Sequence, residues 1–198
     1  TLDGDPISGM PQTSQVALDL QYAIDNTPSG GTLEVPAGVY EITEALSIPK
    51  DKSIEIIGAG GTVTIQQTAE NQQVLNVGTD DSDPGCVDPD HEVVLENVVI
   101  TGARLTNNSL FGGTKGGGGI RVNPGCRVTL IDSEVSDNEV NTTGVSRGGG
   151  IYNDDGFVTL INSKVENNRA LGRVDADSRG GGILSVGLDS VLTLIDSS

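Results

Sequence analysis

The chain has 198 residues, a formal net charge of −17 at pH 7 and a sequence pI of about 4.1. This charge argues against a general affinity for nucleic acid or anionic membranes, which are themselves negatively charged. Aromatic residues make up only 3% of the chain, with no Trp, against 28 Gly. The composition favours a narrow core of Val, Ile and Leu, and no apolar run is long enough to embed the chain in a bilayer.

One amphipathic helix is predicted near the start of the chain, over residues 13–25. Thr13 or Ser14 can cap its N-terminus, and a Pro- and Gly-containing segment at residues 26–31 ends it. Its apolar stripe consists of Ala17, Leu20, Ala23 and Ile24. Because the helix precedes the first strand, we expect it to cover the N-terminal end of the strands that follow.

Residues 32–77 carry the alternating Val, Ile and Thr residues that are typical of β-strands. Short polar or glycine-rich segments separate the runs, which predicts bends between successive strands. The expected strands cover residues 32–42, 46–48, 53–60, 62–65 and 74–77.

An acidic insertion interrupts this pattern at residues 79–92. It contains six carboxylates and no Lys or Arg, so we expect a loop on the side of the strands, with His91 solvated in it. Carboxylate oxygens suit Ca²⁺, which makes this loop the best metal candidate. Its candidate ligands are Asp80, Asp81, Asp83, Asp88 and Asp90. A solvated charged loop without metal is the alternative, because the spacing is not that of an EF-hand.

The two cysteines, Cys86 in the insertion and Cys126 after it, are 40 residues apart. Two cysteines in a chain with an extracellular character predict a disulfide. On the chain-entropy model such a bridge stabilises the fold by about 4 kcal/mol and would attach the insertion to the body of the protein. Two free thiols are the alternative.

The second half of the chain repeats one pattern. Its copies cover residues 93–120, 127–152, 157–184 and 192–197, of which the first is the loosest. Val128 and Val158 are 30 residues apart, and a run of glycines precedes Ile151 and Ile183. A repeat of this length predicts units that bury their apolar side chains only by stacking on their neighbours.

Each unit contains short alternating runs instead of helical spacing, which predicts about two or three strands per unit and a parallel β-helix. A strand spacing of about 4.8 Å would place Leu130, Leu160 and Leu194 in one internal column. Structural roles are also expected for three polar alignments. These are the column of Asn97, Asp132, Asn162 and Asp196, the pair Glu134 and Lys164, and the amide pair Asn138 and Asn168.

Residues 17–24, 30–40 and 54–58 together resemble the N-terminal region of pectate-lyase-like right-handed parallel β-helix proteins. The later units resemble the repeats of bacterial surface and adhesin-like β-helix proteins. The resemblance implies an all-β, right-handed, single-stranded parallel β-helix with a short capping α-helix, forming one domain over residues 1–198. It is specific for the fold only, because this scaffold hosts lyases, hydrolases, epimerases, tailspikes and adhesins.

Two further sets of residues are candidate sites. Lys115, Arg147 and Arg179 each precede a glycine run and would form a cationic column for an acidic glycan, with solvated loop ends as the alternative. Arg121 with Asp154 and Asp155 is the catalytic candidate, because an enzyme of this fold is expected to have an acidic group or a calcium site beside a basic residue on one face.

The favoured hypothesis is a non-catalytic extracellular or cell-surface segment of a larger adhesin-like or stalk-like protein that contacts carbohydrate. A polysaccharide lyase or glycoside hydrolase is one alternative. A fibre subunit that self-associates through an open C-terminal strand is another. The chain stops one strand into a new unit, so we expect the full protein to continue beyond Ser198.

Overall fold

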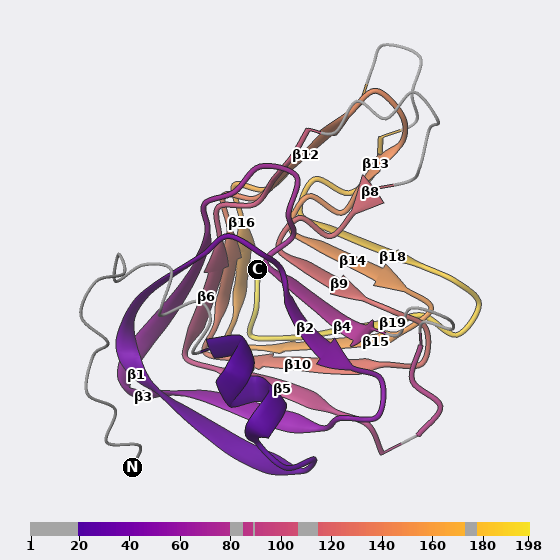
Figure 1. Ribbon diagram of the computed structural model, residues 1–198. Helices are drawn as coiled ribbons and strands as arrows, with labels where there is room; N and C mark the ends of the chain where they lie inside the picture. The colour runs from indigo at the N-terminus through magenta and orange to yellow at the C-terminus, as the bar shows by residue number, and fades with distance from the viewer. Residues whose placement is uncertain (1–19, 80–84, 89, 107–114, 173–177) are drawn as a thin grey trace.

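The computed structural model describes residues 20–79, 85–88, 90–106, 115–172 and 178–198 (Figure 1). The described part is mostly β-strand, and all its strand pairs are parallel. Residues 20–26 are helical, and the rest of the predicted helix lies outside the described residues. None of the described helical segments is long and apolar enough to cross a membrane.

The largest sheet contains two stacks of strands that share β3. The first stack comprises β1 (Gly31–Ile42), β3 (Ile54–Gln67), β5 (Val93–Glu96), β10 (Arg127–Ile131), β15 (Phe157–Ile161) and β19 (Val191–Ile195). The second continues from the C-terminal half of β3 through β6 (Val98–Thr101), β11 (Glu134–Ser136) and β16 (Lys164–Glu166). The two strands expected at residues 53–60 and 62–65 are therefore one, because Gly60 and Gly61 bend it through positive φ without ending it.

The described residues form three further parallel sheets. One comprises β2 (Leu46–Pro49), β4 (Leu75–Thr79), β9 (Ile120–Val122), β14 (Ile151–Asp154) and β18 (Ile183–Val186). Two small sheets contain β7 (Arg104–Leu105), β12 (Glu139–Thr142) and β17 (Arg169–Gly172), and β8 (Lys115–Gly116) with β13 (Ser146–Arg147). Successive sequence units thus contribute strands to the same sheets in the same order.

The apolar residues of successive units lie in register, as the repeat predicts. Leu95, Leu130, Leu160 and Leu194 are consecutive partners in one column, and the first three are fully buried. Because every unit adds one residue to each such column, the core is a continuous stack of Val, Ile and Leu side chains.

The predicted polar column also exists, and its backbone explains the residue types. Its four members Asn97, Asp132, Asn162 and Asp196 have φ values between 48° and 55°. Asn and Asp tolerate this left-handed conformation better than other residues with a side chain. The column therefore marks a bend that recurs in each unit.

The helical segment covers the edge of β2, the first strand of its sheet. Leu20 and Ile24 are buried in the core. The side-chain amide of Gln21 donates to the Ser47 carbonyl (3.0 Å) and accepts from the Ser47 N–H (2.9 Å). These two bonds satisfy backbone groups that an edge strand otherwise leaves unpaired.

Candidate functional site

A polar groove of about 440 Å³ opens where β11 leads into β12 and β16 leads into β17. It is lined by Arg104, Asp137, Asn138, Glu139, Asn167, Asn168 and Arg169. This groove was not predicted from the sequence. Its signal was the adjacent polar pairs that recur between two strands, Asp137 with Asn138 and Asn167 with Asn168.

The floor of the groove is the predicted amide pair of Asn138 and Asn168, which is confirmed. Asn138 is only 1% exposed. Its side-chain N–H groups donate to the Asn168 Oδ1 (3.0 Å) and the Ile100 carbonyl (3.1 Å), and its Oδ1 accepts from the Ala103 N–H (3.1 Å). Since these groups bind one another, the floor has a structural role and leaves ligand contacts to the rim.

The rim carries charged side chains that follow the strand register. Glu139 pairs with Arg104 on one side and with Arg169 on the other, so the charges alternate along this edge. Arg104 and Arg169 are both exposed, as are Asp137 and Asn167, whose positive φ turns the chain between strands. Two exposed guanidinium groups suit carboxylate oxygens of a ligand.

Glycines behind the groove allow close packing against the amide pair. A Cβ at Gly150 would lie 2.7 Å from the Asn168 Nδ2, and Gly148 has a φ of 51°. Ile120, Ile151 and Ile183, which follow the glycine runs, are consecutive register partners. These glycines therefore allow the backbone to pack closely against the amide pair at this bend.

The predicted cationic column is only partly aligned. Arg147 pairs with Arg179, but Lys115 pairs with Ser146, one position before Arg147. The reason is that four glycines follow Lys115 and three follow Arg147, while the units align on the isoleucines. The predicted alignment of Lys115 is therefore wrong. The Nη1 of Arg147 donates to the buried Tyr152 hydroxyl at 3.3 Å, a structural contact.

Arg121 is close to one of its two predicted acidic partners. Its Nη2 lies 3.5 Å from the Asp154 Oδ2, its Nε donates to the Asn123 Oδ1 (3.1 Å), and its guanidinium lies 5.4 Å from the Tyr152 ring centroid. The Asp155 carboxylate accepts instead from the Asp189 N–H (2.8 Å) of the following unit. Arg121 is thus held by neighbouring protein groups, and the three residues do not form the predicted cluster.

Only part of the predicted calcium loop is described. Asp80, Asp81 and Asp83 lie outside the described residues, and calcium binding stays a prediction. Asp88 and Asp90 are exposed, and the Asp88 Oδ1 accepts from the Asp90 N–H (2.9 Å). The Asp88 carbonyl accepts from the His91 N–H (3.1 Å), so this aspartate forms a turn that leads into His91.

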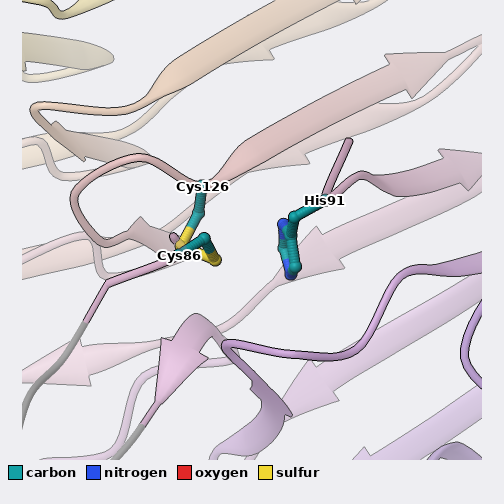
Figure 2. Close-up of side chains that lie close together, drawn as sticks. All are labelled: Cys86, His91 and Cys126. Atoms are coloured by element: carbon teal, nitrogen blue, oxygen red, sulfur yellow. A yellow bond between two sulfur atoms is a disulfide. The ribbon is translucent and has the colours of Figure 1, made fainter. Parts of the chain in front are cut away.

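The predicted disulfide between Cys86 and Cys126 is present (Figure 2). The Cys86 N–H also donates to the Pro124 carbonyl at 2.7 Å, which fixes the insertion against the turn before β10. A Cβ at Gly78 would lie 3.4 Å from the Cys86 Sγ and 3.3 Å from the Asn123 Cβ, and Gly78 has a φ of 84°. A glycine at this position leaves the space that the disulfide occupies.

His91 lies beside the disulfide and is 1% exposed, so the expectation that it is solvated is wrong (Figure 2). The Asp88 turn aims the ring inward, a direction that sequence alone could not reveal. Burial lowers the pKa of the imidazole below its usual value, which the nearby Pro49 and Lys52 carbonyls and the Asp88 charge only partly oppose. Within the described part of the chain, neither ring nitrogen makes a hydrogen bond of normal geometry.

Comparisons with known proteins gave no matching family model, no matching curated protein and no matching solved structure.

Proposed function

We propose that the repeated units form a right-handed, single-stranded parallel β-helix of the pectate-lyase-like type. We further propose that the chain is a non-catalytic segment of an extracellular or cell-surface protein, adhesin-like or stalk-like, that contacts acidic carbohydrate. The in-register stacking of equivalent residues supports the fold. The disulfide is compatible with an oxidising compartment.

The observation that carries the carbohydrate proposal is the rim of the polar groove. Arg104 and Arg169 are exposed there and flank the same residue, Glu139. They lie two strand spacings apart, about 9.6 Å along the stack, so two uronate carboxylates of one oligosaccharide could each meet a guanidinium. Asp137 and Asn167 add acceptors and donors for sugar hydroxyls.

The structural contacts of the amide pair and of Arg121 support a non-catalytic function. The buried amide pair binds neighbouring units, and Arg121 is held by Asp154, Asn123 and the Tyr152 ring. A side chain that acts as an acid or base in catalysis needs to lie within hydrogen-bond reach of the substrate, whereas these side chains bind neighbouring protein groups.

Calorimetric titration with tetragalacturonate tests the carbohydrate proposal, with neutral maltotetraose as the comparison ligand. We expect the uronate to bind and the neutral sugar not to bind. The double variant Arg104→Ala/Arg169→Ala should weaken binding by roughly tenfold or more, because each charge-assisted hydrogen bond contributes about 1.5–3 kcal/mol. Lys164→Ala, which removes an exposed cation outside the groove, is the matched control and should bind as the unmodified chain does. Equal binding by the double variant would refute the proposal.

The same protein incubated with polygalacturonate tests the enzyme alternative. Release of unsaturated sugars, followed by their ultraviolet absorbance, would indicate a lyase, and release of reducing ends alone would indicate a hydrolase. Turnover that is lost in Arg121→Ala would favour an enzyme over the non-catalytic proposal.

The exposed strand β19 supports self-association as a second candidate function. Leu194 and Ile195 are 52% and 46% exposed, and β16, β17, β18 and β19 each end their sheet or branch in the described structure. A second copy could add strands to these edges and cover the apolar side chains. Sedimentation velocity at increasing concentration should then show larger species that Leu194→Lys abolishes. A monomer at every concentration would exclude this role.

A further inference from the structure

Three side chains with metal-binding atoms meet at the base of the acidic insertion. The ligand atoms of Cys86, His91 and Cys126 all lie within 4.8 Å of one another. Cys86 and His91 come from the insertion before β5, whereas Cys126 immediately precedes β10 (Figure 2). Their exposed fractions are 9%, 1% and 0%, so the group is enclosed by protein.

Both ring nitrogens of His91 are buried, and within the described residues neither makes a hydrogen bond of normal geometry, although the Pro49 and Lys52 carbonyls lie nearby. Burial of an unpaired polar group costs about 1–3 kcal/mol, a cost that the buried Asn138 avoids by binding Asn168 of the next unit. A neutral imidazole has a lone pair on one nitrogen, which is the form that binds metal ions.

We propose that reduction of the disulfide converts Cys86, His91 and Cys126 into a three-ligand site for a soft monovalent metal ion such as Cu⁺. A dithiol reductant supplies two electrons and two protons, which break the S–S bond and give two thiols, while the reductant forms its own disulfide. Binding of the ion then displaces the two thiol protons to solvent. The ion keeps its oxidation state and is held by two thiolates and one imidazole.

The number and type of the ligands favour a soft monovalent ion over Zn²⁺. Thiolates select Cu⁺ and Zn²⁺ among biological metals. Zn²⁺ is almost always four-coordinate and completes a three-residue set with water or substrate. All three side chains are nearly or fully enclosed, which leaves little access for such a fourth ligand. A soft monovalent ion such as Cu⁺, which accepts three ligands, would be fully coordinated by the two thiolates and the imidazole.

Contacts other than the S–S bond hold the three residues in place. The Cys86 N–H donates to the Pro124 carbonyl (2.7 Å), and the Cys126 N–H donates to the Asn123 carbonyl (3.1 Å). The His91 N–H donates to the Asp88 carbonyl (3.1 Å). These backbone bonds do not depend on the oxidation state of sulfur, so reduction need not separate the ligands.

Anaerobic titration of Cu⁺ into the whole chain tests the proposal, with a chromophoric chelator as competitor. One sample is reduced beforehand with a phosphine, and the oxidised sample is titrated without the phosphine. We expect one ion per chain for the reduced protein and none at this affinity for the oxidised protein. His91→Leu keeps both cysteines and should weaken Cu⁺ binding by roughly tenfold or more, because it removes one of the three ligands. X-ray absorption at the copper edge should show two sulfur neighbours and one nitrogen neighbour. A parallel titration with Zn²⁺ should show weaker binding.

Several outcomes would overturn the proposal. One is equal Cu⁺ affinity for His91→Leu and the unmodified chain, which would mean that the thiols bind without the imidazole. Another is tighter binding of Zn²⁺ than of Cu⁺. Circular dichroism of the reduced, metal-free chain completes the test, because loss of its strand signal, or a folded reduced chain that does not bind Cu⁺, would also exclude the site.

Discussion

Two buried polar regions of this protein differ in how their polar atoms are satisfied. Asn138, inside the repeat, binds the side chain or backbone of residues in the units on both sides. His91, in the insertion, has no hydrogen-bond partner on either ring nitrogen among the residues that the structure describes. In a repeat, the neighbouring unit presents the matching group at the same height, whereas an insertion that occurs once has no such neighbour. The contrast distinguishes Asn138, whose hydrogen bonds hold successive units together, from His91, whose ring nitrogens remain available to a ligand.

The largest effect on stability should come from the disulfide, which joins the insertion to the repeat. Replacing both cysteines, as Cys86→Ser/Cys126→Ser, should lower the free energy of unfolding by about 4 kcal/mol, because the bridge closes a loop of 40 residues. Urea denaturation measures this change. Addition of a reductant should destabilise the unmodified chain and leave the variant unaffected. A loss below about 1 kcal/mol would mean that the insertion is held by its other contacts.

Removal of one side chain of the amide pair should have the next largest effect. Asn138→Ala leaves the Ala103 N–H and the Ile100 carbonyl without their side-chain partner in a buried place. We expect a loss of about 3 kcal/mol in the free energy of unfolding. The matched control is Asn141→Ala, at an exposed position, which should change stability by less than about 0.5 kcal/mol. Similar losses of stability for the two variants would contradict a structural role for the amide pair.

A methyl group added behind the amide pair should lower the free energy of unfolding by a smaller amount. The Cβ of Gly150→Ala would lie 2.7 Å from the Asn168 Nδ2, so the amide must move. Overpacking of this kind costs about 1–3 kcal/mol, measurable as a lower urea midpoint. Gly38→Ala is the control, because the nearest atom to its Cβ would be 3.8 Å away. If both variants are equally stable, the glycine run is not needed for packing.

The smallest effect is expected at His91 in the oxidised protein. His91→Leu removes two unpaired buried nitrogens and should leave stability at neutral pH unchanged or raise it by up to about 1 kcal/mol. Because burial lowers the pKa of His91, the unfolded chain binds a proton more readily. The unmodified chain should therefore lose stability relative to His91→Leu as the pH falls below about 6.5. Parallel unfolding curves at pH 7 and pH 5 test this, and a constant difference would contradict it.

The features of the repeat could be predicted from sequence because the same short strand pattern recurs in each unit. Leu130 and Leu160 are neighbours in space because they occupy the same position in equivalent strands. The column that contains Asp132 and Asn162 was also predicted, and the positive φ of its bend explains why Asn and Asp occupy it.

Features that depend on irregular segments could not be predicted. Lys115 is out of register because one extra glycine follows it, and the units align on the buried isoleucines. The polar groove forms where two bends stack, so no single unit contains it. The direction of His91 depends on a turn whose geometry has no periodic counterpart.

By itself, the sequence determined the strand pattern, the apolar and polar columns and the pairing of the two cysteines, because periodicity and residue chemistry are local properties of the chain. Only the tertiary structure decided which charged residues share the groove and which polar side chain lies unpaired beside the disulfide. Those outcomes depend on how turns of unequal length place side chains against other units. The length of a turn that occurs only once does not predict which residues of other units it will lie beside.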